Sequence, residues 1–368
     1  MTKTKKLGLI LIPAIIIVAA VTVIVNSIVI PANKYKEAEK LIKSEEYIRA
    51  LPVLADIKDY KDSRDMLKKV WDNIAVRQTI SAGNDCAVGI CQDGSLVATG
   101  YNSKTMKGYD VSGWKDIVSV ETGSGYIVGL RKDGTVVVEG DTKYIKGYEE
   151  WKDIVAISAD RHLAGLKIDG TVVTAGENSN GECDVEKWEN IIAISAGGSF
   201  TAGLKVDGTV VVAGGSGSLN FNPVEKWKDI VSISAGYDHV VGLKADGTVV
   251  SAGSNEVYQC HTAEWKNIIS VSAGFGYTLG LEKSGKVVTT CDVRYQYSGK
   301  VTDWKDIVAI SAGGSQELKF TGKEDSDYRI YRENYNQHSI GIEEDGTLHF
   351  AGNGGYEQFK DWGKIKVK

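Results

Sequence analysis

The histidines and acidic residues of this chain are the side chains most able to carry out chemistry, and their placement argues against a catalytic site. His162, His239 and His338 recur at one position of a repeated pattern, which gives them a structural explanation. His261 and His349 have no evident partners in the sequence. The recurring Asp-Gly pairs are typical of tight turns rather than of acid–base chemistry. Since the sequence holds no phosphate-binding loop, G-x-S-x-G or H-E-x-x-H motif, we expect no catalytic residue, no metal and no cofactor.

The cysteines do not follow the pattern of a disulfide framework or a zinc site. Their number is odd, and no C-x-x-C or close Cys and His spacing occurs. We interpret them as buried or idle thiols, while a pairing of Cys260 with Cys291 stays open. The five are Cys86, Cys91, Cys183, Cys260 and Cys291.

Aromatic side chains form a second group of candidate functional residues, because tyrosine and arginine are typical anchors of protein interfaces. They gather in stretches that differ from repeat to repeat and in a charged insertion at residues 314–337. The alternative is that these aromatics fill the core between repeats, or that the insertion is a mobile tip. We expect the partner-binding residues to be Phe320, Tyr328, Tyr331, Arg332 and Tyr335 of the insertion, together with Tyr101, Tyr144, Tyr258 and Tyr295.

Charge is divided unevenly along the 368 residues, whose formal net charge is −5. Residues 1–75 carry a net charge of +4, and residues 76–368 carry −9. Nucleic-acid binding needs basic surface to neutralise phosphates. The acidic C-terminal part therefore argues against a nucleic-acid partner.

Tryptophan spacing reveals an internal repeat. From Trp114 to Trp362 the intervals between successive tryptophans are 37, 37, 39, 38, 39 and 58 residues. Each tryptophan begins a segment such as WKDIVAIS, and a second element such as AGLKVDGTVV follows it. With a first copy that begins near residue 80, the sequence contains seven such units. A fixed period near 40 residues is typical of a repeat architecture.

Each repeat is predicted to contain short antiparallel strands. The I-V-x-I-S segment alternates, and the next strand ends at Asp-Gly, the strongest signal for a two-residue hairpin. A third strand follows, and we expect a fourth in the variable stretch before the next tryptophan, which is the pattern of a propeller blade. The first and third connections would then share one face with variable sequence, and the uniform Asp-Gly and Trp-x-Asp turns would share the other. The insertion at residues 314–337 falls on the variable face.

These motifs closely resemble the regulator of chromosome condensation repeat family over residues 78–368. The resemblance rests on the SAG and GLKxDGTVV elements and on GENSNGE at residues 176–182, where Glu182 stands in place of the usual Gln. The resemblance implies an all-β, seven-bladed β-propeller in a bacterial membrane-anchored member of the family. Secreted bacterial relatives that the chain resembles bind and inhibit enzymes through one propeller face. A ring must close, or it exposes two sheet edges. Since WGKIKVK at residues 362–368 echoes WKDIVAIS, we expect it to pair near residues 76–83.

Residues 7–30 predict a membrane anchor. This run of 24 residues has no charge, and as a helix it spans about 36 Å, enough for a hydrocarbon core of about 30 Å. Lys3, Lys5 and Lys6 precede it and favour a cytoplasmic N-terminus. A cleaved signal peptide would have a shorter apolar core and a clear cleavage site. We therefore predict a single-pass signal anchor with an extracytoplasmic propeller in the cell membrane.

A charged helical segment separates the anchor from the repeats. Ala38 and Leu41 lie on one predicted apolar stripe, and Leu67 and Val70 lie on another. The segment resembles a tetratricopeptide-like helical hairpin, and Trp71 is assigned to its last helix. The predicted organisation is residues 1–31 for the cytoplasmic end and anchor, 32–75 for the helical neck, and 76–368 for the propeller.

These predictions favour a binding module rather than an enzyme. The partner would be a protein or a cell-envelope glycan on the variable face. One alternative is a hydrolase at the mouth of the propeller channel, which a cluster of perturbed carboxylates there would favour. Another alternative is a structural spacer of the envelope. Fold alone does not choose among them.

Overall fold

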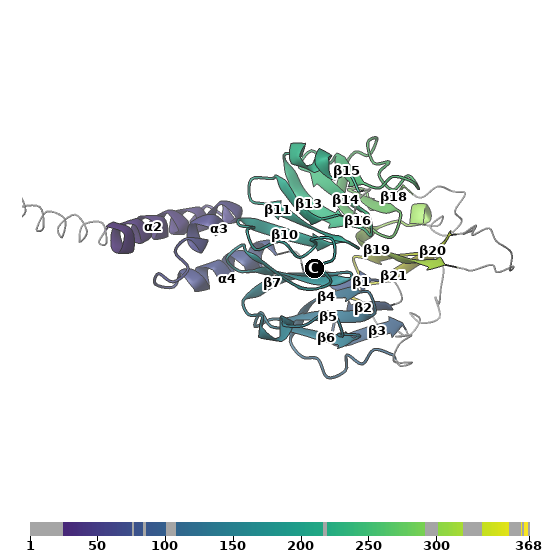
Figure 1. Ribbon diagram of the computed structural model, residues 1–368, viewed down its shortest axis with the longest axis horizontal. Coiled ribbons are helices and arrows are strands. Elements are labelled where there is room, and N and C mark those ends of the chain that lie inside the picture. The colour runs from purple at the N-terminus through teal and green to yellow at the C-terminus, as the bar shows by residue number, and fades with distance from the viewer. Residues whose placement is uncertain are drawn as a thin grey trace, which may run out of the picture. The chain divides into compact units, whose positions relative to one another are not determined.

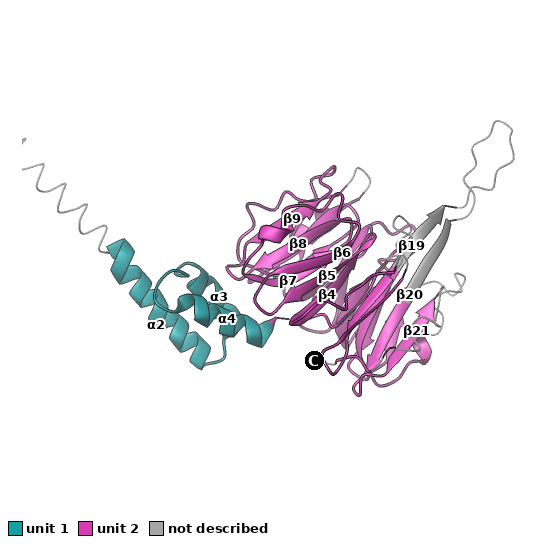
Figure 2. Ribbon diagram, turned by 90° about the horizontal axis from the view of Figure 1, so that it is seen from below, with its two compact units in different colours: residues 1–74 teal, residues 75–368 magenta. Residues whose placement is uncertain are grey.

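The computed structural model describes residues 25–75, 77–83, 86–100, 108–215, 219–290, 301–318, 333–352, 362 and 364–366, with the backbone alone for 314–318 and 333–338. The chain divides into two compact units, residues 1–74 and residues 75–368 (Figure 2). The predicted anchor at residues 7–30 lies largely outside the described residues. Among the helices that the structure describes, none has both the length and the apolar character needed to span a membrane.

The N-terminal unit is helical, as its apolar periodicity predicts. A π-helical turn at Val25–Val29 precedes α2 (Ile30–Lys43), α3 (Tyr47–Ala55) and α4 (Ser63–Ile74). Ala38 and Leu41 are buried in α2, and Leu67, Val70 and Trp71 are buried in α4. The predicted stripes therefore form the core of this unit, and Trp71 belongs to its last helix.

A polar contact ties the first helix of this unit to the loop before the last. The Tyr35 hydroxyl donates to Asp62 Oδ1 at 2.6 Å, and the Lys61 ammonium lies 4.4 Å from the Tyr35 ring centroid. The hydrogen bond to Asp62 raises the pKa of Tyr35 to about 12. Asp62 therefore ties the loop before α4 to α2, which helps to position the last helix of the unit.

The C-terminal unit consists of seven antiparallel sheets of three strands each (Figure 1). The first strands are β1 (Ile80–Ala82), β4 (Ile117–Gly123), β7 (Ile154–Ala159), β10 (Ile191–Ala196), β13 (Ile230–Ala235), β16 (Ile268–Ala273) and β19 (Ile307–Leu318). The second strands are β2 (Cys86–Ile90), β5 (Tyr126–Arg131), β8 (His162–Lys167), β11 (Phe200–Lys205), β14 (His239–Lys244), β17 (Thr278–Glu282) and β20 (Glu333–Glu343). The third strands are β3 (Leu96–Gly100), β6 (Val136–Gly140), β9 (Val172–Gly176), β12 (Val210–Gly214), β15 (Val249–Gly253), β18 (Val287–Thr289) and β21 (Leu348–Gly352).

The first strands follow one another around a closed ring. Each packs against the first strand of the next sheet, and β19 packs against β1. We number the sheets blades 1 to 7 in chain order. The seven predicted repeats are therefore seven propeller blades.

The expected fourth strand is wrong in the blades whose connecting stretch is fully described. Residues 177–190 and 254–267 contain turns and no strand. Short 3-10 helices stand in other connections, at η2 (Tyr148–Glu150), η3 (Asn222–Lys226) and η4 (Val301–Asp303). Variable polar sequences in these stretches lack the alternation that a half-buried strand needs.

The insertion in blade 7 begins and ends as an extended hairpin rather than as irregular loop. Pairing of β19 with β20 runs from Ile307 opposite Glu343 to Leu318 opposite Glu333. Residues 319–332 lie outside the described part of the chain. This hairpin is the first connection of its blade, so it stands on the predicted variable side.

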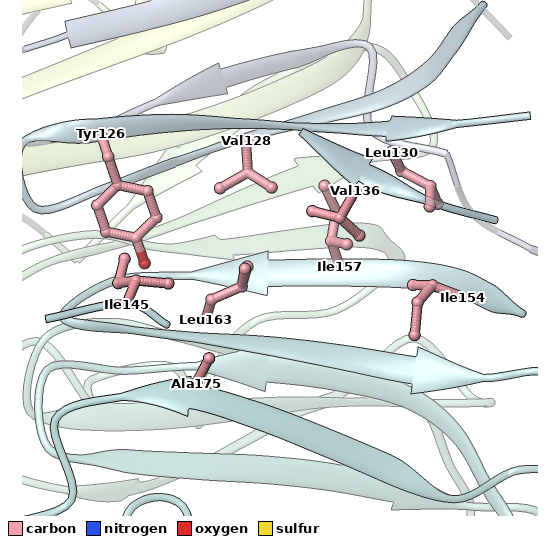
Figure 3. Close-up of a cluster of buried hydrophobic side chains, with 9 residues drawn as sticks. All are labelled: Tyr126, Val128, Leu130, Val136, Ile145, Ile154, Ile157, Leu163 and Ala175. Atoms are coloured by element: carbon pink, nitrogen blue, oxygen red, sulfur yellow. The ribbon is translucent and has the colours of Figure 1, made fainter. Parts of the chain in front are cut away.

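Adjacent blades share their hydrophobic cores. Tyr126, Val128 and Leu130 of blade 2 pack with Ile157 and Leu163 of blade 3 in one buried cluster (Figure 3). The alternation of β5 places these three side chains on one side of its sheet. Stacking of consecutive repeats thus buries apolar surface that one blade would leave exposed.

Candidate binding face

Strand order gives the propeller two faces with different sequence character. In blade 2, β4 pairs with β5 as far as Gly123 opposite Tyr126, and β5 pairs with β6 as far as Leu130 opposite Val136. The two hairpin loops therefore lie at opposite ends of the sheet. We call the end with the first hairpin loops the loop face, formed by residues 124–125, 160–161, 197–199, 236–238 and 274–277. The end with the Asp-Gly turns is the turn face.

The turn face is a repeated scaffold. Asp133 Oδ1 accepts hydrogen bonds from the backbone N–H and the hydroxyl of Thr135, which closes the Asp-Gly turn. The Gly134 carbonyl then accepts a 3.1 Å hydrogen bond from the Ile154 N–H of the next blade. The same bond between consecutive blades recurs from Ile191 to Gly170, Ile230 to Gly208, Ile268 to Gly247 and Ile307 to Gly285. These bonds show that the turns of this face hold consecutive blades together, as expected of a scaffold; that the face binds no partner stays a prediction.

The structure shows the side chains of only two of the predicted partner-binding residues. Tyr144 is 63% exposed and Tyr258 is 43% exposed. The Lys143 ammonium lies 5.0 Å from the centroid of the Tyr144 ring, and Tyr258 meets His261 edge to face with ring centroids 4.7 Å apart, so both contacts are local. Tyr335 lies in β20 opposite Gln316. The others, Phe320, Tyr328, Tyr331, Arg332, Tyr101 and Tyr295, lie outside the described residues.

Other aromatics of the variable stretches serve the core instead. Tyr148 packs against the cluster shared by blades 2 and 3. Phe221 packs on the buried Phe200, with ring centroids 4.5 Å apart. For these residues the alternative considered from the sequence, that the aromatics fill the space between repeats, is confirmed.

A strip of arginine and aromatic side chains crosses the loop face from blade 3 to blade 6. Arg161 Nη2 donates to the Tyr237 hydroxyl at 2.6 Å, and its guanidinium lies 5.2 Å from the centroid of that ring. Tyr237 in turn packs on Phe275, with centroids 4.5 Å apart. Arg161 is exposed, and the two rings are half-buried. We call Arg161, Tyr237 and Phe275 the loop-face strip.

Blade 4 makes room for this strip. The Gly198 N–H donates to the Tyr237 carbonyl at 2.9 Å, and a Cβ at Gly198 would lie 2.7 Å from the ring. A side chain there would displace Tyr237. Sequence reasoning missed the strip because its members occupy short loops of different length, which do not align between repeats. The sequence did carry one signal for this strip. The residues that follow the SA motif differ from repeat to repeat and read DR, GGS, GYD and GFG in blades 3 to 6.

The repeated histidine position is an interblade clamp. His239 Nε2 lies 2.9 Å from Thr278 Oγ1 of the next blade, and that hydroxyl donates to the Gln259 carbonyl at 2.8 Å. Since the hydroxyl proton is committed, His239 Nε2 is the donor in this contact. Asp238 Oδ1 lies 3.6 Å from His239 Nδ1, so the order resembles a nucleophilic triad. Thr278 is completely buried, however, which leaves the arrangement a structural one.

A second clamp repeats this geometry one blade pair earlier. His162 Nε2 lies 2.6 Å from Thr201 Oγ1, whose hydroxyl donates to the Glu182 carbonyl at 2.7 Å. Burial lowers the pKa of His162 to about 4, so the imidazole is neutral. The structural explanation predicted for the repeated histidines is confirmed for His162 and His239, whereas the side chain of His338 is outside the description.

The turn that the sequence revealed around Glu182 has an unrecognised second copy. Asn178 Oδ1 accepts from the Cys183 N–H at 2.8 Å, and Asn255 Oδ1 accepts from the Cys260 N–H at 2.9 Å. Gln259 occupies the position of Glu182, and both are 1% exposed. The thiols of Cys183 and Cys260 each donate to a backbone carbonyl. These two cysteines are therefore structural, as the sequence indicated.

The inner strands carry a ring of serine hydrogen bonds. Ser158 Oγ accepts from the Ala196 N–H of the next blade at 2.9 Å, and Ser311 Oγ accepts from the Ala82 N–H at 3.1 Å across the ring closure. The same bond recurs from Thr122 to Ser81, Ala235 to Ser195, Ala273 to Ser234 and Ala312 to Ser272. Six of the seven repeats use serine here, and the seventh has Glu121.

Two carboxylates interrupt this small-residue ring in adjacent blades. Glu121 occupies the serine position of blade 2, and Asp160 occupies a position that is glycine in the other six repeats. Burial raises the pKa of Glu121 to about 8 and that of Asp160 to about 7. The Ser81 hydroxyl donates to Glu121 Oε2 at 3.0 Å, whereas Asp160 Oδ1 is buried and has no hydrogen-bond partner. Among the described residues, no group of three His, Cys, Asp or Glu is arranged to hold a metal ion.

Comparison with known proteins agrees with the repeat and the fold. Residues 230–259, which end at Gln259, match the family model described as the regulator of chromosome condensation (RCC1) repeat. The segment is one copy of the seven-fold pattern that forms the closed ring. The chain is an RCC1-like β-propeller.

Solved structures similar to this RCC1-like propeller share little sequence with it. The ectodomain of the receptor kinase CR4 from Physcomitrella patens is 17% identical with a TM-score of 0.54, covering 75% of this chain and 73% of that one. The ectodomain of ACR4 from Arabidopsis thaliana is 17% identical with a TM-score of 0.48, covering 64% and 85%. Prp20p from Saccharomyces cerevisiae is 14% identical with a TM-score of 0.44, covering 57% and 70%. No curated protein matches the chain.

Proposed function

We propose that this RCC1-like propeller is a binding module, anchored to the cell membrane by residues 7–30, whose loop face binds a protein partner on the extracytoplasmic side. The loop-face strip carries this proposal. Tyrosine, phenylalanine and arginine are enriched in interface cores, and Arg161, Tyr237 and Phe275 form a contiguous, partly exposed set. The turn face, in contrast, is used for bonds between blades.

The anchor supports the location in this proposal. Its 24 uncharged residues follow three lysines, a pattern that favours a cytoplasmic N-terminus and an exported C-terminal unit. A module held at a membrane by its N-terminus presents the propeller to partners in the surrounding space. A cell-envelope glycan is the alternative partner, since aromatic side chains also stack on sugar rings.

Site-specific photo-crosslinking in intact cells tests the loop face. A benzoylphenylalanine in place of Tyr237 should crosslink the full-length protein to a discrete protein band. The matched control is the same residue in place of Lys132, which is exposed on the turn face. Crosslinking from position 132 and none from position 237 would show that the turn face, and not the loop face, binds the partner.

The strip itself is tested by substitution. Tyr237→Ala and Phe275→Ala should each weaken capture of the crosslinked partner at least tenfold, since interface anchors contribute about 2 kcal/mol or more. Arg161→Lys keeps the charge but loses the planar group that packs on Tyr237, and we expect an intermediate effect. No effect from any of the three, with folding intact, would leave the chain as the envelope spacer considered from its sequence.

A hydrolase is the second candidate, and Glu121 with Asp160 is the observation that favours it. Paired carboxylates with raised pKa values are typical of acid–base chemistry. Hydrolysis of envelope glycans or peptides by the purified full-length chain, lost in Glu121→Gln, would support this candidate over a pure binding role.

A further inference from the structure

Glu121 and Asp160 are carboxylates that the fold does not need. Serine at the first position and glycine at the second serve in all six other repeats. Burial of a carboxylate in place of these residues destabilises the folded chain unless the charge is compensated. Each of these two carboxylates therefore costs stability. Glu121 lies in β4, and Asp160 lies directly after β7, where its carbonyl accepts a 2.7 Å hydrogen bond from the Ser124 N–H of blade 2.

A buried hydroxyl without a partner belongs to the same cluster. Tyr126 is 1% exposed, and its hydroxyl has no hydrogen bond from the protein. Its ring extends from β5 toward blade 3, with the hydroxyl near Ile145 and Leu163 (Figure 3). Burial raises the pKa of Tyr126 well above its usual value, and the nearby charges of Asp160 and Glu121 raise it further. Buried polar atoms in folded proteins are nearly always hydrogen-bonded. The Tyr126 hydroxyl and Asp160 Oδ1 can therefore each accept a hydrogen bond from a donor outside this chain.

The guanidinium of Arg161, the residue after Asp160, is held by a different partner. Burial raises the pKa of Asp160, and the positive charge of Arg161 acts against this rise. Its guanidinium is nevertheless bonded to the Tyr237 hydroxyl and lies over that ring. Asp160 Oδ1 consequently remains without a hydrogen-bond donor. The Arg161 guanidinium is thus engaged within the loop-face strip and makes no hydrogen bond to Asp160 Oδ1.

We propose that Glu121, Tyr126 and Asp160 form a receptor for a cationic side chain, a guanidinium or an ammonium, that a partner protein inserts on the loop face beside Arg161. The proposal rests on the proposed function and names the chemistry of its partner. The carboxylate oxygens of Glu121 and Asp160 and the hydroxyl oxygen of Tyr126 accept hydrogen bonds from the incoming N–H groups. The positive charge of the partner's side chain compensates the negative charges of Glu121 and Asp160, whose burial destabilises the free protein.

Protonation links this binding to pH. The titratable or charged groups around the cluster are Glu121 on β4, Asp160 after β7, Tyr126 on β5, Arg161, and the thiols of Cys86 and Cys183. The cation binds the ionised carboxylates and displaces their protons. We therefore expect tighter binding at pH 8.5 than at pH 6, by roughly tenfold or more.

Peptide probes test the receptor in the full-length protein by titration calorimetry. The probes are acetyl-Gly-Gly-Arg-Gly-Gly-amide and its lysine analogue, and the neutral control replaces arginine with citrulline. We expect at least one cationic peptide to bind tenfold more tightly than the citrulline peptide, with protons released on binding. Equal affinity for the charged and neutral peptides would overturn the receptor.

Variants of Glu121 and Asp160 can carry the residues that the other six repeats have at these positions. Because the fold accepts these residues in every other blade, we expect the variants to fold normally. Glu121→Ser and Asp160→Gly should each weaken the cationic peptide tenfold or more while the melting temperature stays equal or rises. Glu121→Gln keeps the shape and should behave like Glu121→Ser. Unchanged peptide affinity in all three variants would refute the proposal. If a partner still crosslinks at position 237 with full affinity in these variants, the receptor fails while the proposed function stands.

Discussion

Ile365 forms an antiparallel bridge with Cys91, and its side chain is completely buried against blade 1. A Cβ at Gly89 would lie 2.7 Å from Ile365 Cδ1 and 3.1 Å from Trp362, as Ile117 and Trp114 crowd Gly129 in blade 2. The C-terminal segment therefore supplies blade 1 with the tryptophan and isoleucine that begin the W-x-x-I segment of every other repeat. The prediction that the C-terminal segment pairs with the first repeat is confirmed for the described residues 364–366, but their backbone partners are residues 90–92 rather than 76–83.

Ile365→Ala should destabilise the propeller by about 2–5 kcal/mol, the usual cost of truncating a buried isoleucine. The reason is that this side chain fills the junction between the two ends of the ring. Denaturant unfolding of the full-length chain measures the effect, and Lys366→Ala, at an exposed side chain, is the matched control. An unchanged unfolding midpoint for Ile365→Ala would mean that the C-terminal segment is not part of the closure.

Thr278→Val should cost about 1–3 kcal/mol, because it removes the partner of the buried His239 Nε2 and leaves that donor unsatisfied. The double variant His239→Phe with Thr278→Val should recover part of this loss, since blade 4 carries Phe200 at the histidine position. Thermal unfolding of the four proteins forms a double-mutant cycle. Strictly additive effects would show that the clamp carries no coupling energy.

His162 makes the propeller sensitive to acid. Its pKa is about 4 in the folded chain, below the ordinary value near 6.5. Between these values the unfolded chain binds a proton that the folded chain excludes, so stability falls as pH drops from 6.5 to 4, by up to about 1.4 kcal/mol per pH unit. His162→Phe should remove this slope. A stability profile that keeps the slope in the variant would place its origin elsewhere.

Glu121 and Asp160 act in the opposite direction on the pH scale. Their pKa values in the folded chain, about 8 and about 7, lie above the ordinary values of 4.5 and 3.8. Over that interval the unfolded chain releases protons that the folded chain retains, so stability falls as pH rises toward 8. Glu121→Ser with Asp160→Gly should flatten the profile and raise the melting temperature at pH 8. A lower melting temperature for this variant would show that the carboxylates stabilise the fold.

Topology is tested by protease treatment of intact cells or protoplasts. If residues 7–30 cross the membrane with Lys3, Lys5 and Lys6 inside, external protease should digest the propeller and leave a membrane-bound stub. The control is the same treatment after permeabilisation, which exposes both sides. Full protection of the propeller in intact cells would reverse the predicted orientation.

The sequence by itself determined the number of repeats, the order of strands and turns within each repeat, and which connections lie on the loop face and which on the turn face. These features are local, because Asp-Gly turns and alternating apolar residues act within about ten residues, and tryptophan marks each copy. The aspartates and asparagines of the Trp-x-Asp turns follow the same logic, since residues such as Asp153 and Asn190 adopt a positive φ that they tolerate. Residues 177–190 and 254–267 show the limit of this logic, because the usual blade architecture predicts a fourth strand there and the described chain contains turns instead.

Only the tertiary structure decided which residues meet. Arg161 and Tyr237 are 76 positions apart, and their contact depends on a glycine in the intervening blade. Whether an aromatic is exposed like Tyr144 or packed like Phe221 follows from what the neighbouring blade places opposite it, which no single repeat encodes. The same holds for Glu121 and Asp160, whose departures are visible in the aligned repeats but whose proximity comes from the ring. Closure of the ring brings residues from different repeats into contact. These contacts depend on side chains that vary from one repeat to the next, so no single repeat predicts them.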